Sequence, residues 1–176
     1  YYAGQGNTTG WYNTAIGNNA LRTNVDGCHN NAIGTNTLYE NTSGHHNNAT
    51  GYQAMICNTT GCNNTAIGCR ALYGALSGSD NNAIGTDALY SNWGGSANVA
   101  VGGSAMTSNT TGCCNIAIGR NTMYGNTTGT HNTALGNLAL GCNTTGGDNA
   151  ALGTNALYGN TTGGCNVGIG YRAGWC

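Results

Sequence analysis

The sequence predicts an all-β protein: a β-solenoid (β-roll) of ten 17-residue coils, with two short parallel strands in each coil. The first observation is a period, because glycine recurs every 17 residues from Gly17 to Gly170 without an insertion. The second is that so short a unit, with two glycines, cannot hold the pair of helices that helical repeats need. The fixed spacing also argues against disorder, which a chain rich in Asn, Thr and Gly otherwise suggests. We expect residues 1–176 to form one repeat domain.

Each coil is expected to consist of two strands and two bends. Numbered from Asn13 as position 1, the unit reads N-x-A-I-G-x-x-A-L-Y-x-N-T-T-G-x-x. The predicted strands are the segments NTAIG and RALYG, as in residues 64–68 and 70–74. Glycine at positions 5 and 15 suits bends that need a positive φ, and N-T-T-G at positions 12 to 15 is a typical turn sequence. Coils stacked at about 4.8 Å predict a rod of roughly 45–50 Å.

Position 1 is asparagine in every unit, which favours an amide ladder along the rod, each side chain bonded to the one above. The predicted ladder consists of Asn13, Asn30, Asn47, Asn64, Asn81, Asn98, Asn115, Asn132, Asn149 and Asn166.

The core is predicted to be thin, because Ile at position 4 and Leu at position 9 are the only large apolar residues that recur reliably. Neighbouring residues of a strand face opposite ways. If Ile67 and Leu72 point into the coil, Ala66 and Ala71 point out, together with Tyr73. Both faces would then be apolar, so we expect the rod to pack against copies of itself as a homo-oligomer.

Charge and hydropathy exclude several partners. Only 5% of the residues are charged and the formal net charge is −1, so the chain lacks the clustered positive charge that nucleic acids attract. No stretch approaches about eighteen consecutive apolar residues, so we expect no membrane insertion. The absence of a visible signal peptide leaves a cytosolic protein or a mature secreted chain. The nine cysteines and many Asn-x-Thr sequences favour an extracellular protein, secreted or on a cell or particle surface.

The sequence begins at position 6 of a coil and stops at position 11, so both predicted ends are open and lie in the middle of a coil. Neither end carries a polar cap or a charged edge that would block strand addition. Open ends favour head-to-tail stacking into a filament, which is a heterologous contact. The alternative is that the sequence is a piece of a longer chain.

Two pairs of cysteines are candidates for disulfides. Cys57 and Cys62 flank one N-T-T-G bend, and Cys142 and Cys165 nearly repeat that relation with an offset of one coil. Nine is an odd number, so at least one thiol is free or pairs between chains, and Cys176 is the natural intermolecular link. Reduced cysteines that fill small sites are the alternative.

A weak metal candidate lies at positions 16 and 17. His29 and His46 share position 17 in adjacent coils, with His45 and Cys28 beside them. Stacking would place the two imidazoles about 5 Å apart. We favour a solvated ladder of polar side chains, and we expect no metal and no cofactor.

Seven N-glycosylation sequons fall at position 12, where their Asn residues would accept glycans in a secreted eukaryotic protein. Turn chemistry alone also explains N-T-T-G, and we favour that explanation. The seven are Asn7, Asn41, Asn58, Asn109, Asn126, Asn143 and Asn160.

The string N-x-A-I-G followed by x-x-A-L, as in residues 13–21, 30–44, 81–92 and 132–140, resembles the head repeats of YadA-like trimeric autotransporter adhesins. It is also similar to repeats in tail-fibre proteins. The resemblance implies a parallel β-roll, often trimeric, that projects from a cell or particle and binds surfaces.

These features favour a secreted structural protein that stacks head-to-tail or side-by-side into an extracellular fibre or sheath. The alternative is an adhesin or tail-fibre segment that binds surface glycans through outward tyrosines at position 10. Ice binding is a minor alternative, because its threonine columns at positions 13 and 14 are interrupted by Val25, Asp26, Leu76, Trp93 and Gly94. We do not expect an enzyme, because no recurring acid pair, nucleophile elbow or phosphate loop is present.

Overall fold

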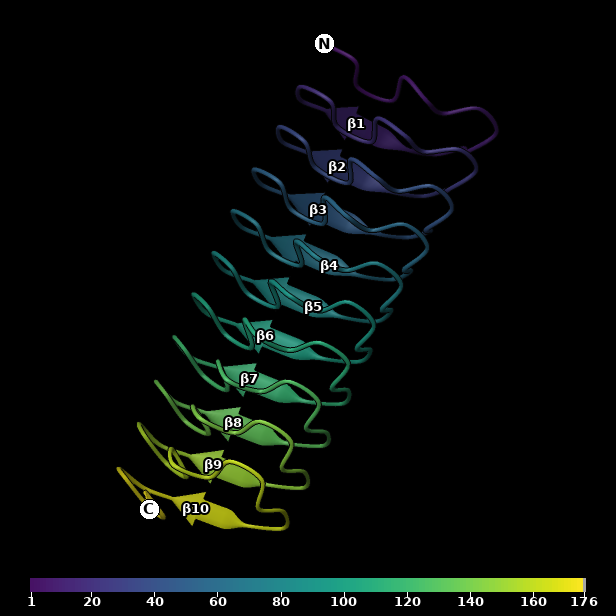
Figure 1. The fold of residues 1–176 in the computed structure, drawn as a ribbon. Helices are drawn as coiled ribbons and strands as arrows, with labels where there is room; N and C mark the ends of the chain where they lie inside the picture. Colours follow the sequence, from purple (N-terminus) through teal and green to yellow (C-terminus); the bar gives the residue numbers. More distant parts are fainter. Residues whose placement is uncertain (176) are drawn as a thin grey trace.

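The computed structural model describes residues 1–175 and shows the predicted β-solenoid (Figure 1). This part of the chain contains no helix, and its ten strands form one parallel sheet whose order follows the sequence. The strands are β1 (Thr14–Ile16), β2 (Asn31–Ile33), β3 (Asn48–Thr50), β4 (Thr65–Ile67), β5 (Asn82–Ile84), β6 (Val99–Val101), β7 (Ile116–Ile118), β8 (Thr133–Leu135), β9 (Ala150–Leu152) and β10 (Val167–Ile169).

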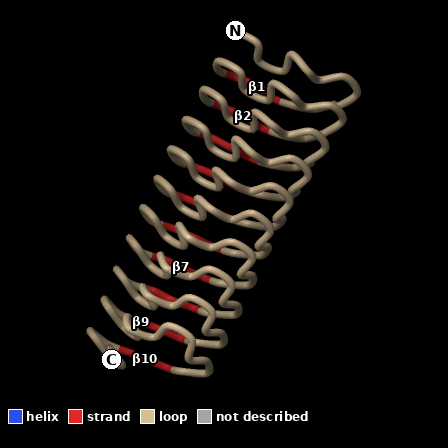
Figure 2. The backbone as a smooth tube through the Cα atoms, in the orientation of Figure 1, coloured by secondary structure: helices blue, strands red, loops and turns tan. Residues whose placement is uncertain are grey.

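The strands pair in register, one sequence period apart. Ala66 in β4 pairs with Ala49 in β3 on one side and with Ala83 in β5 on the other. Each position of the unit therefore becomes a column that runs along the rod. Figure 2 shows that the strands make up a small part of each coil, and that the rest is loop and turn.

The strand side chains face the opposite way from the prediction. Ala66 is fully buried, whereas Ile67 is 40% exposed. Ala71 and Leu72 are both fully buried, so the expectation was right for Leu72 and wrong for the other three. The core therefore combines small residues at positions 3 and 8 with Leu or Met at position 9. The coil is too narrow for isoleucine and leucine to meet across it.

The second predicted strand does not form. Arg70 and Leu72, at positions 7 and 9, have φ values of 55° and 51°, in the left-handed region. These turns break the alternation of a strand, and Ala71 and Leu72 can then both point inward. A left-handed non-glycine residue costs about 1–2 kcal/mol. Inter-coil hydrogen bonds offset this cost, such as the 2.9 Å bond from Leu72 N to Ala88 O.

The two glycine columns have different physical roles. Gly68, at position 5, has a φ of 136°, which confirms the expected need for positive φ. Gly112, at position 15, has no positive φ, so that expectation was wrong. A Cβ atom at Gly112 would lie 2.5 Å from Gly129 O and would also clash with Asn109 Oδ1. Position 15 is therefore glycine because neighbouring coils approach closely there.

The position-1 asparagine ladder is confirmed. Asn98 N and Nδ2 both donate to Asn81 Oδ1 at 3.1 Å. Asn98 Nδ2 also donates to Gly112 O at 2.9 Å. Each ladder residue inside the rod thus ties its own coil to the one before it, and these side chains are buried.

Candidate functional site

The outward side chains of the strands form a continuous uncharged surface, which we call the sheet face. Residues at positions 2 and 4 point out, while position 3 is buried between them, as in β5. Val101 at position 4 is half-buried, and the other aliphatic members range from 36% exposed at Ile33 to 69% at Ile169. Position 4 comprises Ile16, Ile33, Thr50, Ile67, Ile84, Val101, Ile118, Leu135, Leu152 and Ile169, and position 2 comprises Thr14, Asn31, Asn48, Thr65, Asn82, Val99, Ile116, Thr133, Ala150 and Val167.

Across the coil, residues at positions 7 and 10 form a second surface, which we call the tyrosine face. The Tyr73 and Tyr90 rings stack there with centroids 4.8 Å apart. Arg70 Nε lies 2.8 Å from Asp87 Oδ1, and its guanidinium carbon lies 5.5 Å from the Tyr90 ring centroid. Near the N-terminus, Arg22 donates to the Tyr39 hydroxyl at 3.0 Å. Long side chains thus fill the tyrosine face in these coils.

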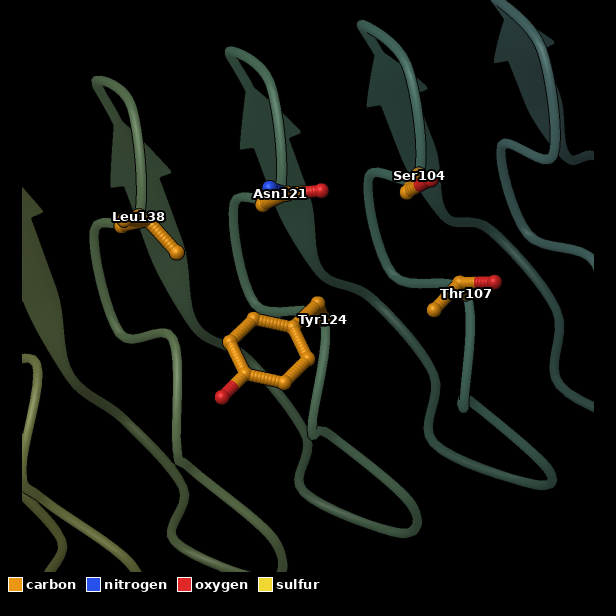
Figure 3. Close-up of a pocket in the computed structure, with 5 residues that line it drawn as sticks. All are labelled: Ser104, Thr107, Asn121, Tyr124 and Leu138. Carbon is orange, nitrogen blue, oxygen red and sulfur yellow. The ribbon is translucent and has the colours of Figure 1, made fainter.

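One part of the tyrosine face is hollow. A cavity of about 420 Å³, which we call the Tyr124 hollow, is lined by Ser104, Thr107, Asn121, Tyr124 and Leu138. These residues come from positions 7 and 10 of three successive coils (Figure 3). In Figure 3 the Tyr124 ring is seen flat, in front of the coils, and its hydroxyl points away from Thr107.

Contacts on the far side of the hollow hold the Tyr124 ring. Its hydroxyl oxygen lies 3.5 Å from that of Tyr158 and 3.8 Å from Cys142 Sγ. These contacts, first the one with Tyr158, raise the pKa of Tyr124 above its ordinary value. Tyr158 can lean toward Tyr124 because Gly141 lies between them: a Cβ atom at Gly141 would lie 2.7 Å from Tyr158 Cε2.

A second, more apolar hollow of about 280 Å³ lies nearer the N-terminus. Trp93, which is 58% exposed, forms one wall, and the absence of a side chain at Gly74 leaves room for the indole. We call it the Trp93 hollow, and its lining residues are Cys57, Tyr73, Gly74, Leu76, Tyr90, Ser91 and Trp93. The sequence predicted the outward tyrosines, but neither hollow, because each depends on small residues that depart from the repeat.

The position-12 sequons form a second asparagine ladder. Asn126 Nδ2 donates to Asn109 Oδ1 at 2.8 Å and to Gly129 O at 3.1 Å. Asn41, Asn58, Asn109, Asn126 and Asn143 are fully buried. An amide nitrogen that is buried and hydrogen-bonded offers no room for a glycan, so these five are not acceptors in the folded rod. Asn160 is half-buried in the same ladder, and Asn7 is exposed but donates to Gly10 O at 2.8 Å.

The threonines at position 13 also bond to the main chain of the next coil. Thr59 Oγ1 donates to Leu76 O at 2.7 Å, and Thr110 Oγ1 donates to Thr127 O at 3.0 Å. Their hydroxyl protons are therefore committed within the rod and are not free to organise surface water.

The histidines stack but do not gather a metal-binding set. The His29 and His46 ring centroids lie 4.9 Å apart with nearly parallel planes. His45 Nδ1 accepts a 3.0 Å hydrogen bond from Cys28 N. Among residues 1–175 no three His, Cys, Asp or Glu side chains come together as metal ligands. The column is a stack of polar and aromatic side chains.

The predicted disulfide pairs do not form in the structure. Cys57, Cys62, Cys142 and Cys165 all carry free thiols. Cys62 Sγ accepts from His45 N at 3.4 Å, whereas Cys57 lines the Trp93 hollow, so the bend between them separates the two thiols. The predicted intermolecular link, Cys176, lies outside the described residues.

Two half-buried thiols are less acidic than an ordinary cysteine. Burial, and then the neighbouring Glu40, raise the pKa of Cys57. Burial, and then Cys114, raise the pKa of Cys113. Neither thiol therefore has the lowered pKa of a catalytic nucleophile.

Fold and surfaces together define the class: a β-solenoid repeat protein with one uncharged aliphatic face and one aromatic face. No helix in the described part of the chain is long and apolar enough to cross a membrane. No family model, curated protein or solved structure matches the chain. The likeness to YadA-like head repeats thus stays an expectation from the sequence.

Proposed function

We propose that the chain is a structural repeat protein that assembles side by side with copies of itself through the sheet face. One observation carries the proposal: an unbroken column of outward residues at position 4, in which only Thr50 is not aliphatic. Eight of these nine aliphatic side chains are exposed and Val101 is half-buried, so the column forms the kind of apolar patch that marks an interaction surface.

A second copy is the partner that fits this face best. The face has no charged side chain, so it offers a charged partner no complementary group. In a second copy the outward side chains of successive strands repeat at the same spacing. The side chains of one sheet can therefore lie between those of the other over the whole length. A partner with another period would match over only a few coils.

The area of the sheet face limits how stable an association through it can be. Ten strands of three residues give roughly 45 Å by 10 Å, or about 450 Å² of sheet per copy. Standard interfaces bury about 800 Å² per partner. We therefore expect a contact through the sheet face alone to depend on protein concentration. The predicted head-to-tail stacking would multiply such contacts along a fibre, and an extracellular location remains a proposal from composition.

Sedimentation velocity over a wide concentration range tests the proposal. We expect wild-type protein to form larger species as concentration rises, and the double variant Ile84→Asp/Ile118→Asp to remain monomeric. Thr111→Asp/Thr128→Asp, which adds the same charges at exposed turn positions, is the matched control and should associate like wild type. Circular dichroism checks that all three keep the fold.

Two results would overturn side-by-side assembly: a wild-type protein that stays monomeric throughout, or a sheet-face variant that still associates normally. Electron microscopy of native material, with and without reducing agent, tests the head-to-tail arrangement separately. Continuous filaments support it, and breakage on reduction would place a disulfide at the junctions. Discrete short rods would contradict it.

A further inference from the structure

The Tyr124 hollow exists because the side chains become small at one place on the tyrosine face. Arg70 and Asp87 cover position 7 in two earlier coils, and Tyr90 covers position 10. In the following coil these two positions are Ser104 and Thr107. The resulting volume of about 420 Å³ lies within the range of small-molecule sites, roughly 300–1,000 Å³.

The polar groups of the hollow are free to bind a ligand. Within residues 1–175, the side chains of Ser104, Thr107 and Asn121 make no hydrogen bond to the protein. Near the N-terminus two amides of the same column bond to each other instead: Asn19 Nδ2 donates to Asn36 Oδ1 at 3.0 Å. Two hydroxyls and an amide offer both donors and acceptors.

The remaining lining is apolar and uncharged. The Tyr124 ring lies flat beside the polar groups, and Leu138 extends the apolar surface in the next coil (Figure 3). The contact with the Tyr158 hydroxyl at 3.5 Å positions the ring before any ligand arrives. Such preorganisation lowers the ordering cost of binding.

We propose that the Tyr124 hollow binds a neutral pyranose sugar. One face of a pyranose presents C–H groups, which pack on an aromatic ring, while its edge carries hydroxyls that both donate and accept hydrogen bonds. Tyr124 and Leu138 meet the first requirement, and Ser104, Thr107 and Asn121 meet the second. No lining residue carries a charge that would favour an acidic sugar.

This binding does not depend on side-by-side assembly. The hollow lies on the tyrosine face, whereas the proposed contact between copies uses positions 2 and 4 of the strands. A monomeric variant such as Ile84→Asp/Ile118→Asp should therefore bind sugar like wild type. Failure of one proposal leaves the other standing.

Saturation-transfer NMR on the full chain tests the proposal with the methyl glycosides of glucose, galactose, mannose and N-acetylglucosamine. We expect at least one to bind in about the millimolar range, as befits a small ligand in an open site. Tyr124→Ala should weaken this binding at least fivefold, whereas Tyr124→Phe, which keeps the ring, should retain most of it. Thr107→Val removes one hydroxyl with little change of shape and should weaken binding at least twofold.

The matched control is Tyr39→Ala, which removes a position-10 tyrosine outside both hollows and should leave binding unchanged. N-acetylneuraminic acid, an acidic sugar, should bind more weakly than the best neutral one. Absence of binding by all four glycosides overturns the proposal. So does full binding by Tyr124→Ala or Thr107→Val, an equal loss in Tyr39→Ala, or a preference for the acidic sugar.

Discussion

Ala75 leaves the side-chain oxygen of Asn58 without a hydrogen-bond donor. In the position-12 ladder each asparagine normally donates to the one before it, as Asn109 does to Asn92 at 2.7 Å. At Ala75 this donor is missing, and Asn58 Oδ1 is buried with no partner within residues 1–175. A buried polar atom without a partner costs about 1–3 kcal/mol. The gap therefore marks the weakest joint of this ladder.

Ala75→Asn should stabilise the rod. The new amide would donate to Asn58 Oδ1 and accept from Asn92 Nδ2, so it joins the two halves of the ladder. We expect the free energy of unfolding to rise by about 1–2 kcal/mol in chemical denaturation. Ala150→Asn, an exposed change on the sheet face, is the control and should alter it by less than about 0.5 kcal/mol. A destabilised Ala75→Asn would show that the site lacks room for the amide.

Asn98→Ala should have the opposite effect. It removes the bonds to Asn81 and Gly112 and leaves Asn115 without its acceptor. We expect a loss of about 3 kcal/mol or more, because several buried groups lose partners together. Asn82→Ala, at an exposed strand position with no side-chain hydrogen bond, should cost under about 0.5 kcal/mol. Equal losses in the two variants would contradict the ladder.

Tyr124 should make stability fall at alkaline pH. Its pKa is raised in the folded rod, so the fold favours the protonated phenol. This contribution is complete below the ordinary tyrosine pKa of about 10 and is lost as pH rises toward the folded value. The stability advantage of wild type over Tyr124→Phe should therefore be constant below about pH 10 and shrink as the pH rises above it in denaturation experiments. A constant difference would rule out titration of this hydroxyl.

Cys57 should react more slowly with iodoacetamide than Cys69. Cys69 is exposed, whereas Cys57 is half-buried and its raised pKa lowers the fraction of reactive thiolate. Mass spectrometry of the native protein after short exposure should find Cys69 more extensively modified than Cys57. In denaturant the two rates should converge, and a difference that persists there would point away from the fold as its cause.

Ala97→Gly should stabilise the rod, although glycine usually weakens regular structure. Ala97 has a φ of 56°, which costs an alanine about 1–2 kcal/mol and costs a glycine little. Glycine also loses more backbone entropy on folding, which offsets part of this benefit. We therefore expect the free energy of unfolding to rise by up to about 1 kcal/mol. Ala150→Gly in β9 is the same change in extended backbone and should instead destabilise by about 0.5–1 kcal/mol. Unfolding midpoints of the two variants should shift in opposite directions.

The period alone predicted most of the architecture. An uninterrupted 17-residue repeat with asparagine at position 1 requires stacked coils and an amide ladder, and both are present. The outward tyrosines were predicted from strand alternation, although that alternation does not hold in their segment, where positions 7 and 9 are left-handed. At position 12 the sequence predicts only a turn, because Asn in N-T-T-G is typical of one. This local explanation leaves no separate sign that the position-12 asparagines form a second ladder.

The errors have a common physical origin. Strand alternation places Ala66 and Ile67 on opposite sides but does not say which side is the core, and hydrophobicity favoured the larger residue. The choice depends on coil width, which left-handed turns such as Leu72 determine. A left-handed leucine is rare enough that no pattern predicts it. The hollows were missed because they arise from single departures, such as Ser104 and Thr107, from an otherwise uniform repeat.

The hydrogen bonds between coils join residues about one period apart, and they run along the axis of the rod. A force applied along that axis therefore loads the coils in series, and the weakest gives way first. Each coil that peels off lengthens from about 4.8 Å of rod to roughly 55–60 Å of extended chain. Under tension the molecule would extend more than tenfold, one coil at a time, and would absorb mechanical work at every step.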